Sequence, residues 1–336
     1  MTRAPLLLLL VGGCAVAPPP RVRAPRPAAA AEVTGRARLV RDARALGPLV
    51  RSAWVRHLLE GTRRLPAIAT RRLYHDADRR RFYTEAQSRE LSAAMRRALK
   101  PLVVDEEYYY STRYGSPLAY SRALDLVAGR GLAGLASRRV LDFGYGKIGH
   151  LRLMALCGAR VVGVDVDPSL PLVYGRPGDQ GEGLRLIDGR FPADPAVRRA
   201  VGAGYDLVTA KNVLKAGYIH PARPVVPPRR AIDLGVPDAR FVEALFALLR
   251  PGGFLVIYNL YPEQSPPDKP YKPWADGKTP FPRRLFEAAG FEVLDYDRDD
   301  TAFIRRLGRT LGWDRGPDAM DLEHDLFAIY TIARRP

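Results

Sequence analysis

The segment VLDFGYGKIGHLRLMALCGARVVGVDVDP, residues 140–168, decides the fold of this chain. It opens in an apolar run over 139–143, passes through a glycine-rich turn into a helical pattern over 149–157, and ends in a second apolar run over 160–165. A strand, a helix and another strand in this order predict a βαβ unit, whose strands lie parallel in one sheet. Gly144 and Gly146 stand in the turn, where the missing Cβ allows a sharp bend and the close approach of a ligand.

The same alternation of apolar runs and helical patterns continues to the end of the chain. Further strands are predicted over 183–187, 205–209, 253–258, 291–296 and 326–333, with helices between most of them, including 239–249 and 283–289. We therefore predict an α/β domain over residues 104–336. Its sheet has seven strands, is mostly parallel and doubly wound, and closes with a hairpin-like pair.

Three features of this domain resemble a known family. The acidic residue Asp142 precedes the first glycine by two positions, IDGRF (187–191) follows the third strand, and LLRPGGF (248–254) leads into the fifth. The last of these contains an L-x-P-G-G turn, in which a helix stops and glycines reverse the chain into a strand. Together with the strand order, these features resemble the class I S-adenosylmethionine-dependent methyltransferases.

This resemblance implies S-adenosyl-L-methionine as cofactor. Asp142 would organise the amino-acid end of that cofactor, and Gly144 and Gly146 would bring the backbone close to it. Asp165 would accept hydrogen bonds from both ribose hydroxyls, a role that suits a carboxylate. Asp188 would lie where such enzymes hold adenine, although its residue type and position are equally those of a turn carboxylate.

Residues 108–115, YYYSTRYG, place four tyrosines and an arginine shortly before the first strand of the domain. We count Arg113 and Tyr114 among the candidate cofactor-binding residues, in a segment that closes over the cofactor with Arg113 near its carboxylate. The alternative is a loop whose rings pack on the edge of the sheet.

The glycine turn also departs from the family pattern. Ile148 stands where the third glycine is usual, and the glycine follows one place later, at Gly149. The resulting G-Y-G-K-I-G satisfies the dinucleotide fingerprint G-x-G-x-x-G, with an acidic residue about 20 positions on. An NAD-binding interpretation therefore stays open.

Two long loops are predicted to enclose the substrate, because ligands of open α/β sheets bind beyond the carboxyl ends of the strands. One follows the fourth strand and runs to about residue 236, and the other, 261–282, contains seven prolines. The first loop supplies three candidate catalytic residues: His220 as base, Asn212 to position the nucleophile, and Tyr218. Lys211 and Lys215 are possible further contacts.

Other functions find less support in the sequence. No Asp/Asn-Pro-Pro-Tyr/Phe motif is present, which argues against methylation of nucleic-acid bases, and no specific nucleic-acid site is seen. Residues 1–100 hold 21 basic and 7 acidic side chains, but the arginines are scattered without interleaved aromatic residues, as on solvated helix faces. We predict no metal site, and interpret the acidic run 297–300 as a solvated or ion-paired turn.

The N-terminal residues resemble a targeting signal followed by a linker. Residues 1–14 resemble a signal peptide that ends in a lipobox at Cys14, 15–35 form a Pro- and Ala-rich linker, and 36–103 form a basic helical extension. A lipidated Cys14 would attach the protein to a membrane of the bacterial envelope. The alternative is a disordered tail on a cytoplasmic protein.

The leading functional prediction is an S-adenosylmethionine-dependent methyltransferase that acts on an oxygen or nitrogen of a small molecule or envelope component. Two alternatives stay open: a non-catalytic, membrane-tethered S-adenosylmethionine-binding protein, and an NAD-dependent oxidoreductase. The leader conflicts with the first prediction, because an exported enzyme would lack its cytoplasmic methyl donor. The sequence identifies neither the methyl acceptor nor the oligomeric state.

Overall fold

The structure is a computed structural model that describes residues 34–77, 81–110 and 116–336. The leader with Cys14, most of the linker and the pair Arg113–Tyr114 lie outside the described residues. Thr34–Pro336 form one compact unit. Within the described part of the chain, no helix has the length and apolar character needed to cross a bilayer.

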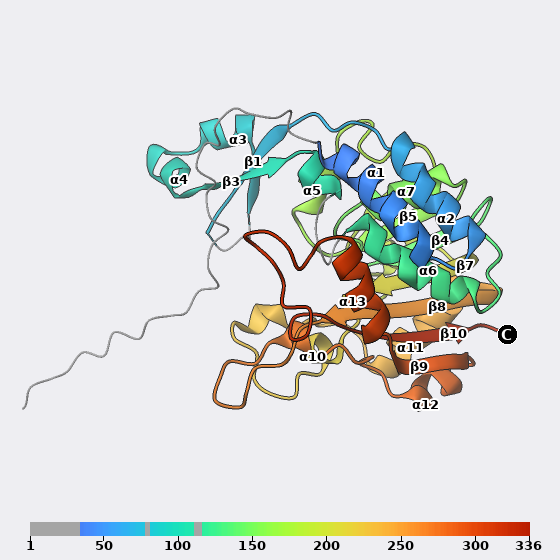
Figure 1. Cartoon of the computed structure of the whole chain (residues 1–336). Coiled ribbons are helices and arrows are strands. Elements are labelled where there is room, and N and C mark those ends of the chain that lie inside the picture. The colour runs from blue at the N-terminus through green and yellow to red at the C-terminus, as the bar shows by residue number, and fades with distance from the viewer. Residues whose placement is uncertain (1–33, 78–80, 111–115) are drawn as a thin grey trace, which may run out of the picture. The chain divides into compact units, whose positions relative to one another are not determined.

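A seven-stranded sheet forms the centre of this unit, in the order β6-β5-β4-β7-β8-β10-β9 (Figure 1). Strands β4 to β8 run parallel, and β10 pairs antiparallel with both β8 and β9. The predicted α/β sheet and its antiparallel closing pair are confirmed. The strands are β4 (Arg139–Phe143), β5 (Arg160–Asp165), β6 (Leu184–Asp188), β7 (Tyr205–Lys211), β8 (Leu249–Tyr261), β9 (Glu292–Asp299) and β10 (Phe327–Arg334).

The central strands place alternate side chains in two apolar layers, because successive residues of a strand point to opposite faces. In β4, Val140 belongs to one layer and Leu141 to the other, and Leu207 and Val208 of β7 divide in the same way. The first layer contains α6 (Tyr120–Ala128), α7 (Gly149–Leu156) and α13 (Thr301–Thr310). The second contains α9 (Pro195–Val201), α11 (Asp238–Leu248) and α12 (Arg283–Ala288).

The N-terminal extension packs into the first layer. Its helices α1 (Gly35–Leu46) and α2 (Ala53–Glu60) bury Leu39, Leu46 and Leu58 in the core that also holds α6 and α7. The extension also contains the short helices α3 (Glu85–Glu90) and α4 (Ala93–Ala98).

The extension also contains a small antiparallel sheet, in the order β2-β1-β3, which the sequence analysis missed. Its strands are β1 (Arg71–His75), β2 (Phe82–Thr84) and β3 (Lys100–Val104). They are short, and the exposed face of β1 and β3 includes arginine and proline. The alternation of apolar and polar residues that marks a strand is therefore too short to be recognised in the sequence.

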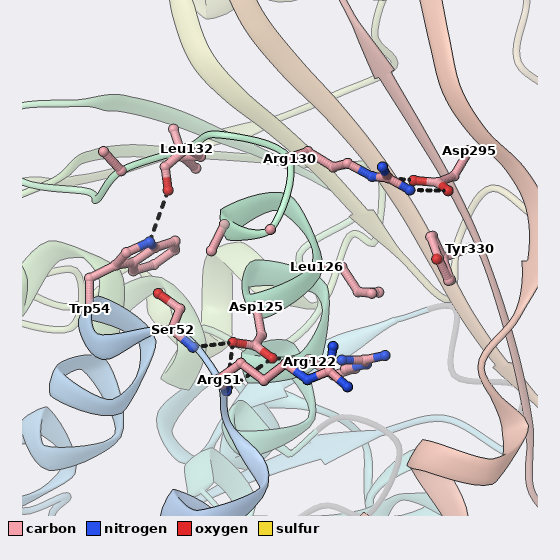
Figure 2. A pocket seen from close by; sticks show the side chains of 13 residues that line it. Arg51, Ser52, Trp54, Arg122, Asp125, Leu126, Arg130, Leu132, Asp295 and Tyr330 are labelled. Atoms are coloured by element: carbon pink, nitrogen blue, oxygen red, sulfur yellow. Dashed lines mark hydrogen bonds and ion pairs between the residues drawn. The ribbon is translucent and has the colours of Figure 1, made fainter.

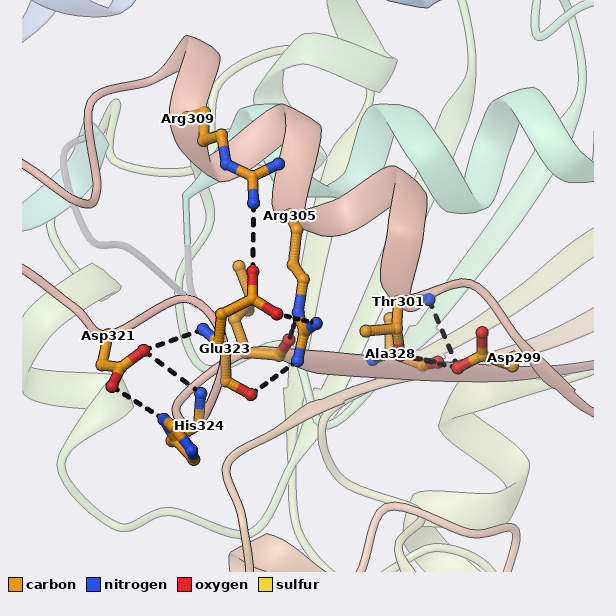
Figure 3. A network of polar contacts seen from close by, with 9 residues as sticks. Asp299, Thr301, Arg305, Arg309, Asp321, Glu323, His324 and Ala328 are labelled. Carbon is orange, nitrogen blue, oxygen red and sulfur yellow. Dashed lines mark hydrogen bonds and ion pairs between the residues drawn. The ribbon is translucent and has the colours of Figure 1, made fainter.

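Acidic side chains of two stretches near the C-terminus pair with arginine and histidine side chains of the same chain. Asp300 accepts two hydrogen bonds from Arg122, at 2.6 and 2.8 Å. Arg305 and Arg309 of α13 pair with Glu323, beside a contact between Asp321 and His324 (Figure 3). These contacts tie the segment between α13 and β10 to α13.

Three further α-helices have only four or five residues each. They are α5 (Glu106–Tyr110), α8 (Leu170–Tyr174) and α10 (Ala216–Ile219).

Candidate functional site

Three carboxylates lie on one face of the sheet at the carboxyl ends of adjacent parallel strands. Asp165 of β5 is registered with Asp188 of β6, and Asp142 of β4 with Gly163, two residues before Asp165. Registered residues of parallel strands point to the same face, so all three carboxylates face the layer of α7. Strand β4 lies between β5 and β7, so the direction in which successive strands are added reverses at β4. The three carboxylates lie beside this switch point, where open α/β sheets bind ligands.

Asp142 is completely buried and bonded on both oxygens. Its registered neighbour on β7, Thr209, donates a hydroxyl hydrogen bond to Oδ1. His150 Nε2 lies 2.7 Å from Oδ2, and the Tyr120 hydroxyl donates to the same oxygen at 3.5 Å. A buried carboxylate needs such partners, since its charge has lost water.

His150 and Tyr120 were not predicted from the sequence. Their rings stack with centroids 3.5 Å apart and planes inclined by 11°. His150 is 2% exposed, and within the described residues its Nδ1 has no hydrogen-bond partner. In the sequence, the only indication that His150 belongs to the site is its position directly after Gly149, the glycine that begins α7.

Two buried lysines complete this cluster. Burial lowers the pKa of Lys211, at the end of β7, to about 7, although Asp142 acts in the opposite direction. Its Nζ lies 4.9 Å from the centre of the Tyr120 ring. Burial, and then the charge of Lys211, lower the pKa of Lys215 to about 7.

Lys215 also connects the two long loops. Its Nζ donates to the carbonyl oxygens of Leu260, at 2.6 Å, and Trp274, at 3.0 Å. The segment after β7 is thereby joined to the end of β8 and to the proline-rich loop that follows it.

The glycine turn has the backbone geometry that the sequence analysis expected. Gly144 and Gly146 have φ values of +73° and +49°, a region that residues with a Cβ rarely adopt. The Gly146 N–H donates to Asp165 Oδ2 at 2.9 Å, and the Asp167 N–H donates to Oδ1 at 3.0 Å. Burial raises the pKa of Asp165, which these two hydrogen bonds partly offset.

The end of β6 presents the third carboxylate to solvent. Asp188 is exposed and accepts a hydrogen bond from the Tyr145 hydroxyl at 3.5 Å. Tyr145 itself is buried against Gly163, where a Cβ would lie 2.8 Å from the ring. Each oxygen of a carboxylate can accept two hydrogen bonds, so Asp165 and Asp188 both keep acceptor capacity.

The first turn of α7 is covered by protein. A Cβ on Gly149 would lie 2.6 Å from the Pro117 side chain and 2.8 Å from the Tyr109 carbonyl oxygen. Ile148, Gly149 and His150 are all buried. Among the described residues, the start of α7 is therefore packed against other parts of the chain.

The three predicted catalytic residues lie in different surroundings. His220 is half exposed, with Nε2 2.8 Å from Asp238 at the start of α11. Asn212, at φ +63°, accepts the Leu260 N–H on its side-chain oxygen at 2.7 Å. Tyr218 is partly buried, and its ring centre lies 5.7 Å from Lys215 Nζ.

Comparison with known proteins gives structural likeness alone. No family model matches the chain, and no curated protein matches it. Among solved structures, phosphoethanolamine N-methyltransferase 2 of Haemonchus contortus is 12% identical, with a TM-score of 0.43 over 80% of this chain and 69% of that one. An S-adenosylmethionine-dependent methyltransferase of Mesorhizobium loti is 15% identical, with a TM-score of 0.38 over 63% and 98%.

A third structure, the [4+2]-cyclase SpnF, is 19% identical, with a TM-score of 0.39 over 68% of this chain and 86% of that one. At these identities and scores the likeness is limited to the fold. The strand order and the residues at the strand ends must therefore support any statement about function.

Proposed function

We propose that this protein is an S-adenosylmethionine-dependent methyltransferase. The observation that carries the proposal is the arrangement of Asp142, Asp165 and Asp188 on one sheet face around the positive-φ glycine turn. Such a row offers acceptors for the hydroxyls and ring nitrogens of a nucleoside at the switch point of the sheet. When bound, S-adenosylmethionine supplies a methyl group on a positively charged sulfur.

The start of α7 favours this proposal over NAD binding. A dinucleotide fold holds the pyrophosphate against the open N-terminus of the helix after the glycine turn. Here Ile148 and His150, on either side of Gly149 at the start of α7, are buried, so other described residues of the chain cover that end of the helix.

We assign the role of base to Lys211 in place of His220. Lys211 ends β7 beside Asp142, and burial keeps its amine largely uncharged slightly above neutral pH. It would take the proton from an oxygen or nitrogen nucleophile as that atom forms its bond to the methyl carbon and the sulfur–carbon bond breaks. The loops joined by Lys215 would enclose the acceptor, for which we propose a small molecule or an envelope component.

A binding experiment tests the proposal on the full chain. Calorimetric titration should detect S-adenosylmethionine and S-adenosylhomocysteine but not NAD. Asp165→Asn should weaken both by about tenfold or more, since hydrogen bonds to a charged group contribute about 1.5–3 kcal/mol. The control Asp314→Asn changes an exposed carboxylate beside Arg315 and should have no effect.

Binding of NAD alone, or of none of the three ligands, would contradict the proposal. Binding of both S-adenosyl compounds without turnover on any acceptor would favour the non-catalytic alternative. One observation supports that alternative: the amines of Lys211, beside Asp142, and of Lys215 are both buried at the candidate site. A cationic donor is repelled there whenever the lysines are protonated.

A further inference from the structure

A cavity of about 550 Å³ lies away from the row of carboxylates. The segment Arg51–Trp54 forms one wall, α6 with the turn after it forms the second, and Asp295 of β9 with Tyr330 of β10 forms the third (Figure 2). Its volume is within the range of small-molecule sites. Asp142, Asp165, Asp188 and the glycine turn are not among its lining residues.

Most charges in this cavity are already paired. Arg130 donates two hydrogen bonds to Asp295, at 2.6 and 2.8 Å. Asp125 accepts the backbone N–H groups of Arg51 and Ser52, at 3.1 and 2.7 Å. Arg122, which is bonded to Asp300 behind the wall, lies 3.6 Å from Asp125. With Asp300 counted, the two arginines and three aspartates of these pairs leave one negative charge.

The guanidinium of Arg51 supplies the balancing positive charge but takes no part in these contacts. It has no hydrogen-bond or ion-pair partner within the part of the chain that the structure describes, and the residue is exposed. Its backbone is nevertheless held at the rim by the contact with Asp125. A planar guanidinium offers a pair of parallel donors that match a carboxylate.

Part of the lining is apolar. Trp54 donates its indole N–H to the Leu132 carbonyl oxygen at 2.9 Å, which leaves the ring face to line the cavity, and Leu126 and Ala128 of α6 line it as well. An apolar wall beside a single unpaired cation suits a ligand with one anionic group and an apolar body.

We propose that this cavity binds a small organic carboxylate whose charge pairs with Arg51 and whose apolar body lies between Trp54 and α6. The region as a whole is neutral when Asp300 is counted, so recognition depends on the local contact with Arg51 and not on a long-range field. Occupancy joins the N-terminal extension, α6 and the antiparallel pair of strands β9 and β10.

Benzoate and its uncharged analogue benzamide test this site in ligand-observed NMR titrations of the full chain. Benzoate should bind at least tenfold more tightly than benzamide. Arg51→Gln should abolish that preference, whereas the control Arg63→Gln, an exposed arginine outside the cavity, should retain it. Ala128→Phe, which places a ring in the cavity, should remove the binding of both compounds.

Each opposite result would overturn the proposal. It fails if benzamide binds as well as benzoate, if benzoate does not bind at millimolar concentration, or if Arg51→Gln leaves the affinity within twofold. Unchanged binding by a folded Ala128→Phe variant would place any bound benzoate elsewhere on the protein. The methyltransferase proposal is unaffected by these outcomes, because it concerns other residues.

Discussion

Lys211 and Lys215 give the candidate site a dependence on pH. Both have a pKa near 7, so their ammonium groups lose charge as the pH rises through neutrality. S-adenosylmethionine carries a sulfonium charge that S-adenosylhomocysteine lacks, whereas the amino-acid and nucleoside parts of the two are alike. The ratio of their affinities therefore isolates the repulsion between the sulfonium and the lysines.

We expect that ratio to shift toward S-adenosylmethionine between about pH 6 and about pH 8.5. Two unit charges about 8 Å apart at an effective dielectric constant near 20 interact by about 2 kcal/mol, which is roughly 30-fold in affinity. Lys211→Met should flatten the dependence, and Lys100→Met, on exposed β3, should leave it unchanged. Calorimetric titrations at the two pH values measure it; a constant ratio in the unmodified protein would refute the role of the lysines.

At the scale of elements, Gly149 tests whether the start of α7 is closed. A Cβ there would lie within 2.8 Å of both Pro117 and the Tyr109 carbonyl. Gly149→Ala should therefore lower the free energy of unfolding by about 1–3 kcal/mol through overpacking. The control Gly47→Ala has nothing within 4 Å of the new Cβ and a φ of −46°, so it should be neutral or slightly stabilising. Urea denaturation compares the two; equal stabilities would mean that the α7 start is open.

The elements also show what could be predicted from the sequence. The parallel strands were predictable because β4, β5 and β7 each contain a short run of apolar residues, and the glycine turn because Gly144 and Gly146 stand between such a run and a helical pattern. The small β2-β1-β3 sheet was not, since its strands have three to five residues.

The site was predictable only in part. Asp142, Asp165 and Asp188 follow from their places at strand ends. The contacts of Asp142 with Tyr120 and Thr209 span 22 and 67 positions of sequence, so they exist only after α6 and β7 have packed against β4. A loop histidine such as His220 is easy to notice in a sequence, whereas a helix histidine such as His150 reads as an ordinary core residue.

The whole molecule depends on its N-terminal extension for a complete core. Leu39 and Leu46 of α1 and Val55, Leu58 and Leu59 of α2 are all at most 3% exposed and belong to the core that contains α6 and α7. Burial of one such side chain contributes about 1.5–3 kcal/mol, whereas a whole domain is stable by about 5–15 kcal/mol. Residues 104–336 are therefore not expected to fold without α1 and α2.

Two deletions examine this dependence by thermal unfolding followed by circular dichroism. Removal of residues 1–33 should leave the unfolding temperature nearly unchanged, because the compact unit begins at Thr34, whose side chain accepts the Ala37 N–H at the start of α1. Removal of residues 1–60 should abolish the cooperative transition, since the uncovered faces of α6 and α7 would expose a large apolar surface. A cooperative transition in the longer deletion would show that the sheet domain folds by itself, and that the extension is an accessory to it.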